Sequence, residues 1–329
     1  MKPGKKLRLL NPRLPPSSGL RPSALCRLAL VAMPSSSANH SGVASLAPHL
    51  YLWTLVSSDH HVLLHHFLRH YSSLGVLLAT HAHIVIHRRD NGTESDHGVR
   101  RVHAVLTNFG GVGNVSEYVE PSVKALEGGK LERVNTILRS LPPQAWLIYA
   151  DTDELFSYPC DIASRLGRTG ATCAHMSDRV DADVVGMQPI RRTPSIEEQF
   201  PTCTRTRGLV LKATTLKLTL LRARIHGYVP IYRTAHRVLA GPHVIGGYGG
   251  SGCTYLGRFS HYSMSAESYQ LSTTKIHDGE YSEVYRRIVG LLDWKASTRD
   301  GGRLVFTAEA RTKINRTRMA CPLQLQCTT

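Results

Sequence analysis

The sequence lacks several features that define familiar classes of protein. Its seven cysteines form no C-x-x-C pair, which argues against a structural zinc site, and their odd number gives no complete set of disulfides. No apolar run approaches the roughly 20 residues that a bilayer-spanning helix needs, so we expect no transmembrane segment. Acidic residues are missing from the first 58 positions, which carry seven Lys or Arg.

The positive charge is concentrated at the two ends of the chain. The net charge of +16 includes +7 from residues 1–58 and +4 from residues 299–329, which leaves +5 for residues 59–298. A nucleic-acid-binding protein needs a clustered basic footprint on its folded surface. Because the basic residues gather in the ends, and no aromatic-rich basic stretch accompanies them, we predict no nucleic-acid partner.

Composition divides the chain into three parts. Residues 1–45 are rich in Pro, Ser and Gly, and we predict a disordered basic leader with the character of a targeting segment. Residues 46–298 are predicted to form one globular domain, and residues 299–329 a basic tail. Four N-x-[ST] sequons favour a location in the secretory pathway or Golgi lumen: Asn39, Asn91, Asn114 and Asn315.

The pattern along the globular part alternates between strand and helix. Apolar runs predict strands at 50–56, 83–87, 102–106 and 146–150. Apolar stripes predict helices at 60–74, 116–126 and 130–141, the last two split by Gly128-Gly129. Strands that alternate with helices predict an α/β fold with a mostly parallel sheet.

The chain is organised around the apolar run 146–150, which is followed at once by Asp151, Asp153 and Glu154. A run this short, bounded by prolines, predicts a buried parallel strand. The acids should lie at its carboxyl end, because an unpaired carboxylate costs several kcal/mol to bury and because open α/β sheets bind ligands at that edge. In extended chain Asp151 and Asp153 point the same way, roughly 6.5–7 Å apart, which suits one divalent cation.

No Lys or Arg occurs between Gln144 and Arg165, so local ion pairing cannot neutralise the acidic pair. We therefore expect a metal ion as its partner, with Asp153 as the direct ligand. Further candidates follow along the chain. Asp178, Asp181 and Asp183 come after a probable strand, and the segment 258–262 is a short predicted strand that includes His261.

Several segments, in the same order, resemble glycosyltransferases of the family-2 and family-92 type, which have the Rossmann-like GT-A fold. The segment 146–156 is similar to the family's W-x-x-x-x-D-x-D-E-F signature, with Leu155-Phe156 at its end. The segment 177–183 is similar to its D-R segment, 199–201 to its F-P, and 259–275 to its closing H-Y…K segment. After the first strand the family usually has Asn-Glu, where this chain has Ser57-Ser58-Asp59.

The resemblance implies a nucleotide-sugar donor, a hydroxyl acceptor and transfer with inversion at the anomeric carbon. Asp151, Asp153 and His261 would bind the metal, Mn²⁺ in preference to Mg²⁺ because imidazole suits transition metals. Donor contacts are expected from Asp151, Arg133, Ser57 and Lys275. Inversion needs a base for the acceptor hydroxyl, for which the candidates are Asp178, Asp181 and Asp183.

Two other interpretations remain open at this stage. An apolar run followed by Asp-x-Asp also begins phosphatases of the haloacid-dehalogenase type, although these carry Thr or Val where this chain has Leu155 and place the motif near the start of the fold. The second alternative is a non-catalytic basic protein that binds carbohydrate or nucleic acid. Stabilisation by UDP with Mn²⁺ would distinguish a transferase from both.

Overall fold

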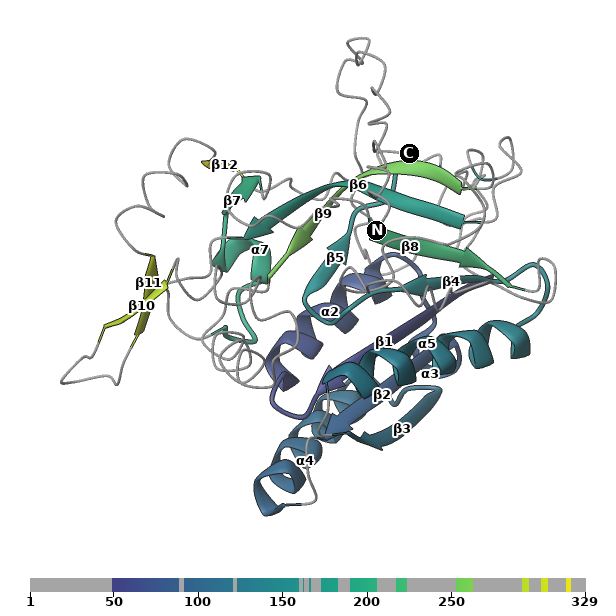
Figure 1. Cartoon of the computed structure of the whole chain (residues 1–329), viewed down its shortest axis with the longest axis horizontal. Coiled ribbons are helices and arrows are strands. Elements are labelled where there is room, and N and C mark those ends of the chain that lie inside the picture. Colours follow the sequence, from purple (N-terminus) through teal and green to yellow (C-terminus); the bar gives the residue numbers. More distant parts are fainter. Residues whose placement is uncertain are drawn as a thin grey trace, which may run out of the picture.

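The centre of the fold is a set of four parallel strands in the spatial order β3 (Asn114–Val119), β2 (Ala82–Arg88), β1 (Leu50–Ser57) and β4 (Trp146–Tyr149) (Figure 1). This is the 3-2-1-4 order of a Rossmann-like sheet, which confirms the predicted α/β class. The computed structural model describes residues 49–88, 92–120, 123–159, 162, 166, 173–182, 190–205, 217–223, 253–262, 292–295, 303–306 and 318–320.

Antiparallel strands extend this sheet beyond β4. The path continues through β8 (Lys217–Arg222), β6 (Cys173–Ala182), β7 (Thr202–Arg205) and β12 (Arg318–Ala320). The strand β9 (Cys253–His261) pairs in parallel with β6 and antiparallel with β5 (Glu154–Phe156). A separate hairpin consists of β10 (Leu292–Lys295) and β11 (Arg303–Phe306).

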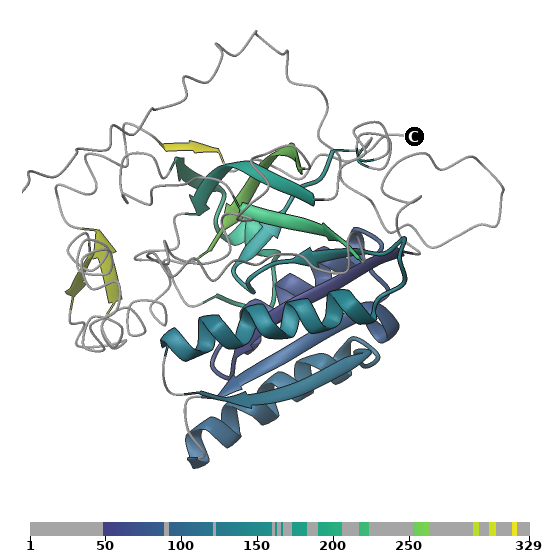
Figure 2. The same cartoon turned by 45° about the vertical axis from the view of Figure 1, so that its right-hand side comes forward.

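Helices cover both faces of the parallel strands (Figure 2). On one face lie α2 (His61–Ser73) and α4 (Thr93–Asn108), and on the other lies α5 (Val123–Ser140). Two short helices, α3 (Leu78–His81) and α7 (Ile196–Gln199), complete the described set. The core is therefore divided in two by the sheet, as the alternation of side chains along each strand requires.

Each half of the core has its own aromatic centre. On the side of α2, the rings of Phe67 and Tyr71 are fully buried with Phe156. On the side of α5, Trp53 of β1 stacks on Tyr149 of β4 with ring centroids 5.2 Å apart. Aromatic pairs of this kind contribute about 0.5–1.5 kcal/mol beyond the area they bury.

The strands predicted at 50–56, 83–87 and 146–150 are confirmed, as is the helix at 60–74. The strand predicted at 102–106 is wrong, because this segment belongs to α4. Val99, Val102, Val105 and Leu106 have helical spacing, and all four are buried against the sheet. The helix ends at Asn108, and Gly110-Gly111 follow it with positive φ values that permit the reversal of the chain.

The helix predicted at 116–126 is also wrong, since residues 114–119 form β3. The helix α5 then runs without a break through Gly128-Gly129, where the sequence had suggested a division. A Cβ atom at Gly129 would lie 2.7 Å from the phenol oxygen of Tyr118. Glycine at this position therefore allows β3 and α5 to pack closely.

The predicted leader, residues 1–45, and most of the predicted tail lie outside the described residues, so these domain limits stay predictions. In the part of the chain that the structure describes, no helix combines the length and apolar character needed to cross a bilayer.

Two histidines of α2 are buried and donate hydrogen bonds to backbone carbonyls. Nε2 of His70 lies 2.9 Å from the oxygen of Phe156, and Nε2 of His66 lies 2.6 Å from the oxygen of Arg191. Burial lowers the pKa of both imidazoles. The folded chain therefore binds fewer protons than the unfolded chain below about pH 6.5, so its stability is lost as the pH falls.

The variant His70→Gln keeps an N–H donor for Phe156 but removes one titrating group. We expect the decrease in unfolding free energy between pH 6.5 and 5 to be shallower in this variant, by up to about 1.4 kcal/mol per pH unit. Urea unfolding followed by circular dichroism at several pH values measures this slope. His97→Gln, at an exposed position of α4, is the control, and equal slopes for His70→Gln and wild type would contradict the expectation.

Candidate functional site

The acidic residues lie in a turn at the carboxyl ends of β1 and β4. All four residues of β4 are buried, and the strand pairs in parallel with β1. After it, Asp151 and Asp153 are partly exposed, whereas Thr152 and Glu154 are buried. The two aspartates thus emerge at the sheet edge where α/β folds bind ligands, as the apolar run predicted.

The buried residues of this turn hold it in place. The hydroxyl of Thr152 donates to the carbonyl oxygen of Leu55 on β1 at 3.2 Å. The carboxylate of Glu154 accepts a hydrogen bond from the backbone N–H of Asp151 at 3.1 Å. The Tyr71 hydroxyl donates to the carbonyl oxygen of Glu154 at 3.0 Å and accepts from the N–H of Phe156 at 3.3 Å. Glu154 therefore closes the turn, and the aspartates carry the exposed charge.

Asp151 forms an ion pair that the sequence did not predict. The ammonium of Lys130, on α5, lies 3.2 Å from the Asp151 carboxylate, and the two side chains are 11% and 31% exposed. The expectation that ion pairing could not neutralise the acids considered only their neighbours in sequence. That segment does contain no partner, but α5 precedes β4 and returns antiparallel to it, which brings Lys130 from outside the segment to the acidic turn.

The strand β9 brings the distant His261 to the same turn. In the sheet register His261 lies opposite Glu154 on one side and Asp181 on the other. The next residue, Tyr262, donates its backbone N–H to the carbonyl oxygen of Asp153 at 2.8 Å. The backbones of the two predicted metal-binding segments are therefore in contact. The imidazole itself is outside the described side chains, so its distance to Asp153 stays a prediction.

The candidate bases are placed only in part. Asp178 and Asp181 lie within β6, so the expectation that they follow a strand is wrong. In the register of β9, Asp178 pairs with Arg258 and Asp181 with His261. Their side chains, and Asp183 altogether, lie outside what the structure describes. The pairing nevertheless brings one candidate base next to the backbone of a candidate metal ligand.

The predicted donor-binding residues are spread over several places. Ser57 is the last residue of β1, at the same sheet edge as the acidic turn, and its carbonyl oxygen accepts from the N–H of His60 at 2.9 Å. Arg133 lies on α5, one turn after Lys130, and its guanidinium carbon is 4.4 Å from the ring centroid of Tyr118. Lys275 lies outside the described residues.

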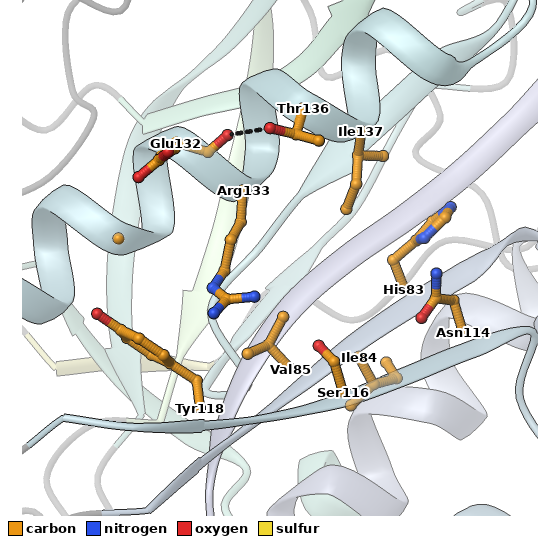
Figure 3. A pocket seen from close by; sticks show the side chains of 11 residues that line it. His83, Ile84, Val85, Asn114, Ser116, Tyr118, Glu132, Arg133, Thr136 and Ile137 are labelled. Atoms are coloured by element: carbon orange, nitrogen blue, oxygen red, sulfur yellow. Dashed lines mark hydrogen bonds between the residues drawn. The ribbon is translucent and has the colours of Figure 1, made fainter.

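A cavity of about 460 Å³ lies beside α5, between this helix and the strands β2 and β3 (Figure 3). Arg133 and Tyr118 line it towards the carboxyl ends of the strands, and His83 and Asn114 line it towards the other end. The acidic turn is not among its lining residues. The cavity and the acidic turn are therefore two separate features, linked by α5.

A bound metal ion needs more ligands than the described side chains supply together. Among these residues there is no group of three His, Cys, Asp or Glu side chains suitable for one ion. Asp151 and Asp153 are two oxygen donors of the kind that Mg²⁺ and Mn²⁺ accept, and such ions commonly complete their coordination with water and phosphate oxygens. The donor set thus fits an ion that binds together with a phosphorylated substrate.

Sequence reasoning missed Lys130. The available signal was its place near the beginning of a helix that leads directly into the acidic strand, because such a helix begins near the strand's carboxyl end. Arg133, in the same helix, was predicted instead.

Comparison with known proteins gives little further information. No protein-family model matches the chain, and no curated protein matches it. Among solved structures, one similar chain is TarS of S. aureus, a glycosyltransferase. The TM-score is 0.30 and the sequence identity 9%, and the match covers 70% of this chain and 39% of TarS. A similarity of this size carries no conclusion about chemistry.

The ion pair between Lys130 and Asp151 should be measurable in a double-mutant cycle. Because Lys130 is largely buried and Asp151 is partly exposed, we expect Lys130→Met and Asp151→Asn to be coupled by about 0.5–2 kcal/mol. Urea unfolding of the two single variants and the double variant gives this energy. Strictly additive effects would contradict the contact.

Proposed function

We propose that this chain is a metal-dependent glycosyltransferase that moves a sugar from a nucleotide-sugar donor to a hydroxyl acceptor. One observation carries the proposal: a buried parallel strand ends in a fixed turn that presents Asp151 and Asp153 at the carboxyl edge of a 3-2-1-4 sheet, with the backbone of the His261–Tyr262 segment bonded to that turn. The resemblance of these same segments to family-2 and family-92 transferases supports it.

Asp151, Asp153 and His261 would hold Mn²⁺ or Mg²⁺. When bound, this ion would neutralise the charge that develops on the departing diphosphate. The ammonium of Lys130 lies 3.2 Å from the Asp151 carboxylate. It would add a second positive charge, besides that of the metal ion, near the diphosphate. Ser57 and Lys275 are the further candidates for contacts to the donor, whereas Arg133, the third residue expected from the sequence, lies in the cavity that the acidic turn does not line.

The reaction requires an acceptor oxygen to attack the anomeric carbon while the bond from that carbon to the diphosphate oxygen breaks. The proton of the acceptor hydroxyl passes to a carboxylate, for which Asp178, Asp181 and Asp183 are the candidates. Attack from the side opposite the leaving group inverts the anomeric centre. The sequons at Asn39, Asn91 and Asn315 favour the secretory pathway as the place of this reaction, whereas the Asn114 side chain lines the cavity beside α5.

A phosphatase of the haloacid-dehalogenase type receives no support from the order of the elements. In that class the acidic motif follows the first strand of the fold, whereas β1, β2 and β3 precede it here.

The first test of the proposed function is stabilisation by nucleotide. UDP with Mn²⁺ should raise the melting temperature of the wild-type protein, because a ligand at 100 times its Kd stabilises the folded state by about 2.7 kcal/mol. Asp153→Asn should abolish the shift and His261→Ala should reduce it, as measured by differential scanning fluorimetry. Glu117→Gln, which removes an exposed carboxylate on β3, is the matched control and should keep the full shift. An unshifted wild type, or a full shift in Asp153→Asn, would refute the proposal.

The second test identifies the base. Each of Asp178→Asn, Asp181→Asn and Asp183→Asn should keep the shift with UDP and Mn²⁺, and one of them should abolish transfer. Sugar release or transfer measured across a set of nucleotide sugars gives the turnover, and proton NMR of the anomeric signal gives the stereochemistry. Normal turnover in all three variants would place the base elsewhere, and a retained configuration would exclude single displacement.

A further inference from the structure

The cavity beside α5 opens to solvent at the edge strand β3 and combines polar and apolar lining side chains. The strand β3 directs Asn114, Ser116 and Tyr118 towards it, and α5 contributes Arg133 (Figure 3). The hydrophobic core on this side of the sheet borders the cavity at Val85 and Ile137. Ser116, Tyr118 and Arg133 are only partly exposed, so polar groups reach below the surface at this place.

Arg133 gives the cavity a fixed positive charge. Its guanidinium lies over the Tyr118 ring, with the central carbon 4.4 Å from the centroid, and no carboxylate among the described residues lies within 4 Å of it. A guanidinium held on an aromatic face keeps its edge donors available for an anion. Two carboxylates lie near: Glu132 lines the cavity at an exposed position, and Glu120 accepts a hydrogen bond from the Tyr118 hydroxyl at 3.4 Å.

The rest of the lining suits a molecule with hydroxyl groups. The Asn114 amide and the Ser116 hydroxyl both donate and accept hydrogen bonds, which matches the mixed character of a polyol. The volume of about 460 Å³ lies within the range of small-molecule sites and exceeds the need of a bare ion. Gly129 contributes by allowing Tyr118 to pack close beneath the helix.

We propose that this cavity is a second binding site, for a compact polyhydroxylated anion of about monosaccharide size that carries a phosphate or a carboxylate. The anionic group binds Arg133, and the hydroxyl groups bind Asn114 and Ser116. The site is separate from the acidic turn and does not depend on the proposed transferase activity.

Titration calorimetry with four probes tests this site: glucose 6-phosphate, glucuronate, glucose and inorganic phosphate. At least one of the two anionic sugars should bind at least tenfold more tightly than both glucose and inorganic phosphate, and the better of the two identifies the anionic group. Arg133→Ala should weaken that binding tenfold or more, and Arg133→Lys should weaken it less because the charge remains. Equal affinities for all four probes, or no binding, would overturn the proposal.

A second pair of variants separates this site from the acidic turn. Ser116→Val fills the cavity with a side chain that suits a strand, so it should abolish binding of the anionic sugar and keep the shift with UDP and Mn²⁺. Asp153→Asn should do the reverse. Glu117→Gln, the neighbouring position on the opposite side of β3, should change neither. Loss of both ligands in a folded Ser116→Val variant would make the cavity part of the donor site and overturn the proposal of a second site, and so would unchanged sugar binding.

Discussion

The burial of β4 is the constraint on which the rest of the structure depends. This strand lies between β1 and β8 with all four residues inside the core, so the carboxylates that follow it have to emerge at its end. Thr152 and Tyr71 then fix the turn by hydrogen bonds to backbone groups that the sheet already holds. The burial of β4 thereby determines where the two aspartates become exposed. The hydrogen bonds to the buried strands then hold the candidate site in one geometry.

The two halves of the sheet meet at this turn. The parallel half supplies the edge at which the ligand crevice of an α/β fold lies, and the antiparallel half supplies β9, which pairs with both β5 and β6. Residues more than 100 positions apart are joined there by the bond from the Tyr262 N–H to the Asp153 carbonyl oxygen. The antiparallel extension therefore places the backbone of His261 and Tyr262 against the acidic turn.

The helix α5 contributes to two places at once. Lys130 contacts the acidic turn, and Arg133, one turn later, lies over Tyr118 in the polar cavity. Gly129, the residue before Lys130, lets the helix pack closely on Tyr118 of β3. The helix therefore supplies one positive charge to each of the two places.

The sequence by itself determined the parallel strands at 50–56, 83–87 and 146–150 and the place of the acids, because short apolar runs bounded by turn residues have few alternatives. It did not determine the state of 102–106, a short apolar run that suits a strand until the helical spacing of its buried residues is known. Only the tertiary structure decided the contact between Lys130 and Asp151 and the pairing of β9 with the turn. These depend on how elements far apart in the chain return to one edge of the sheet, which local pattern does not encode.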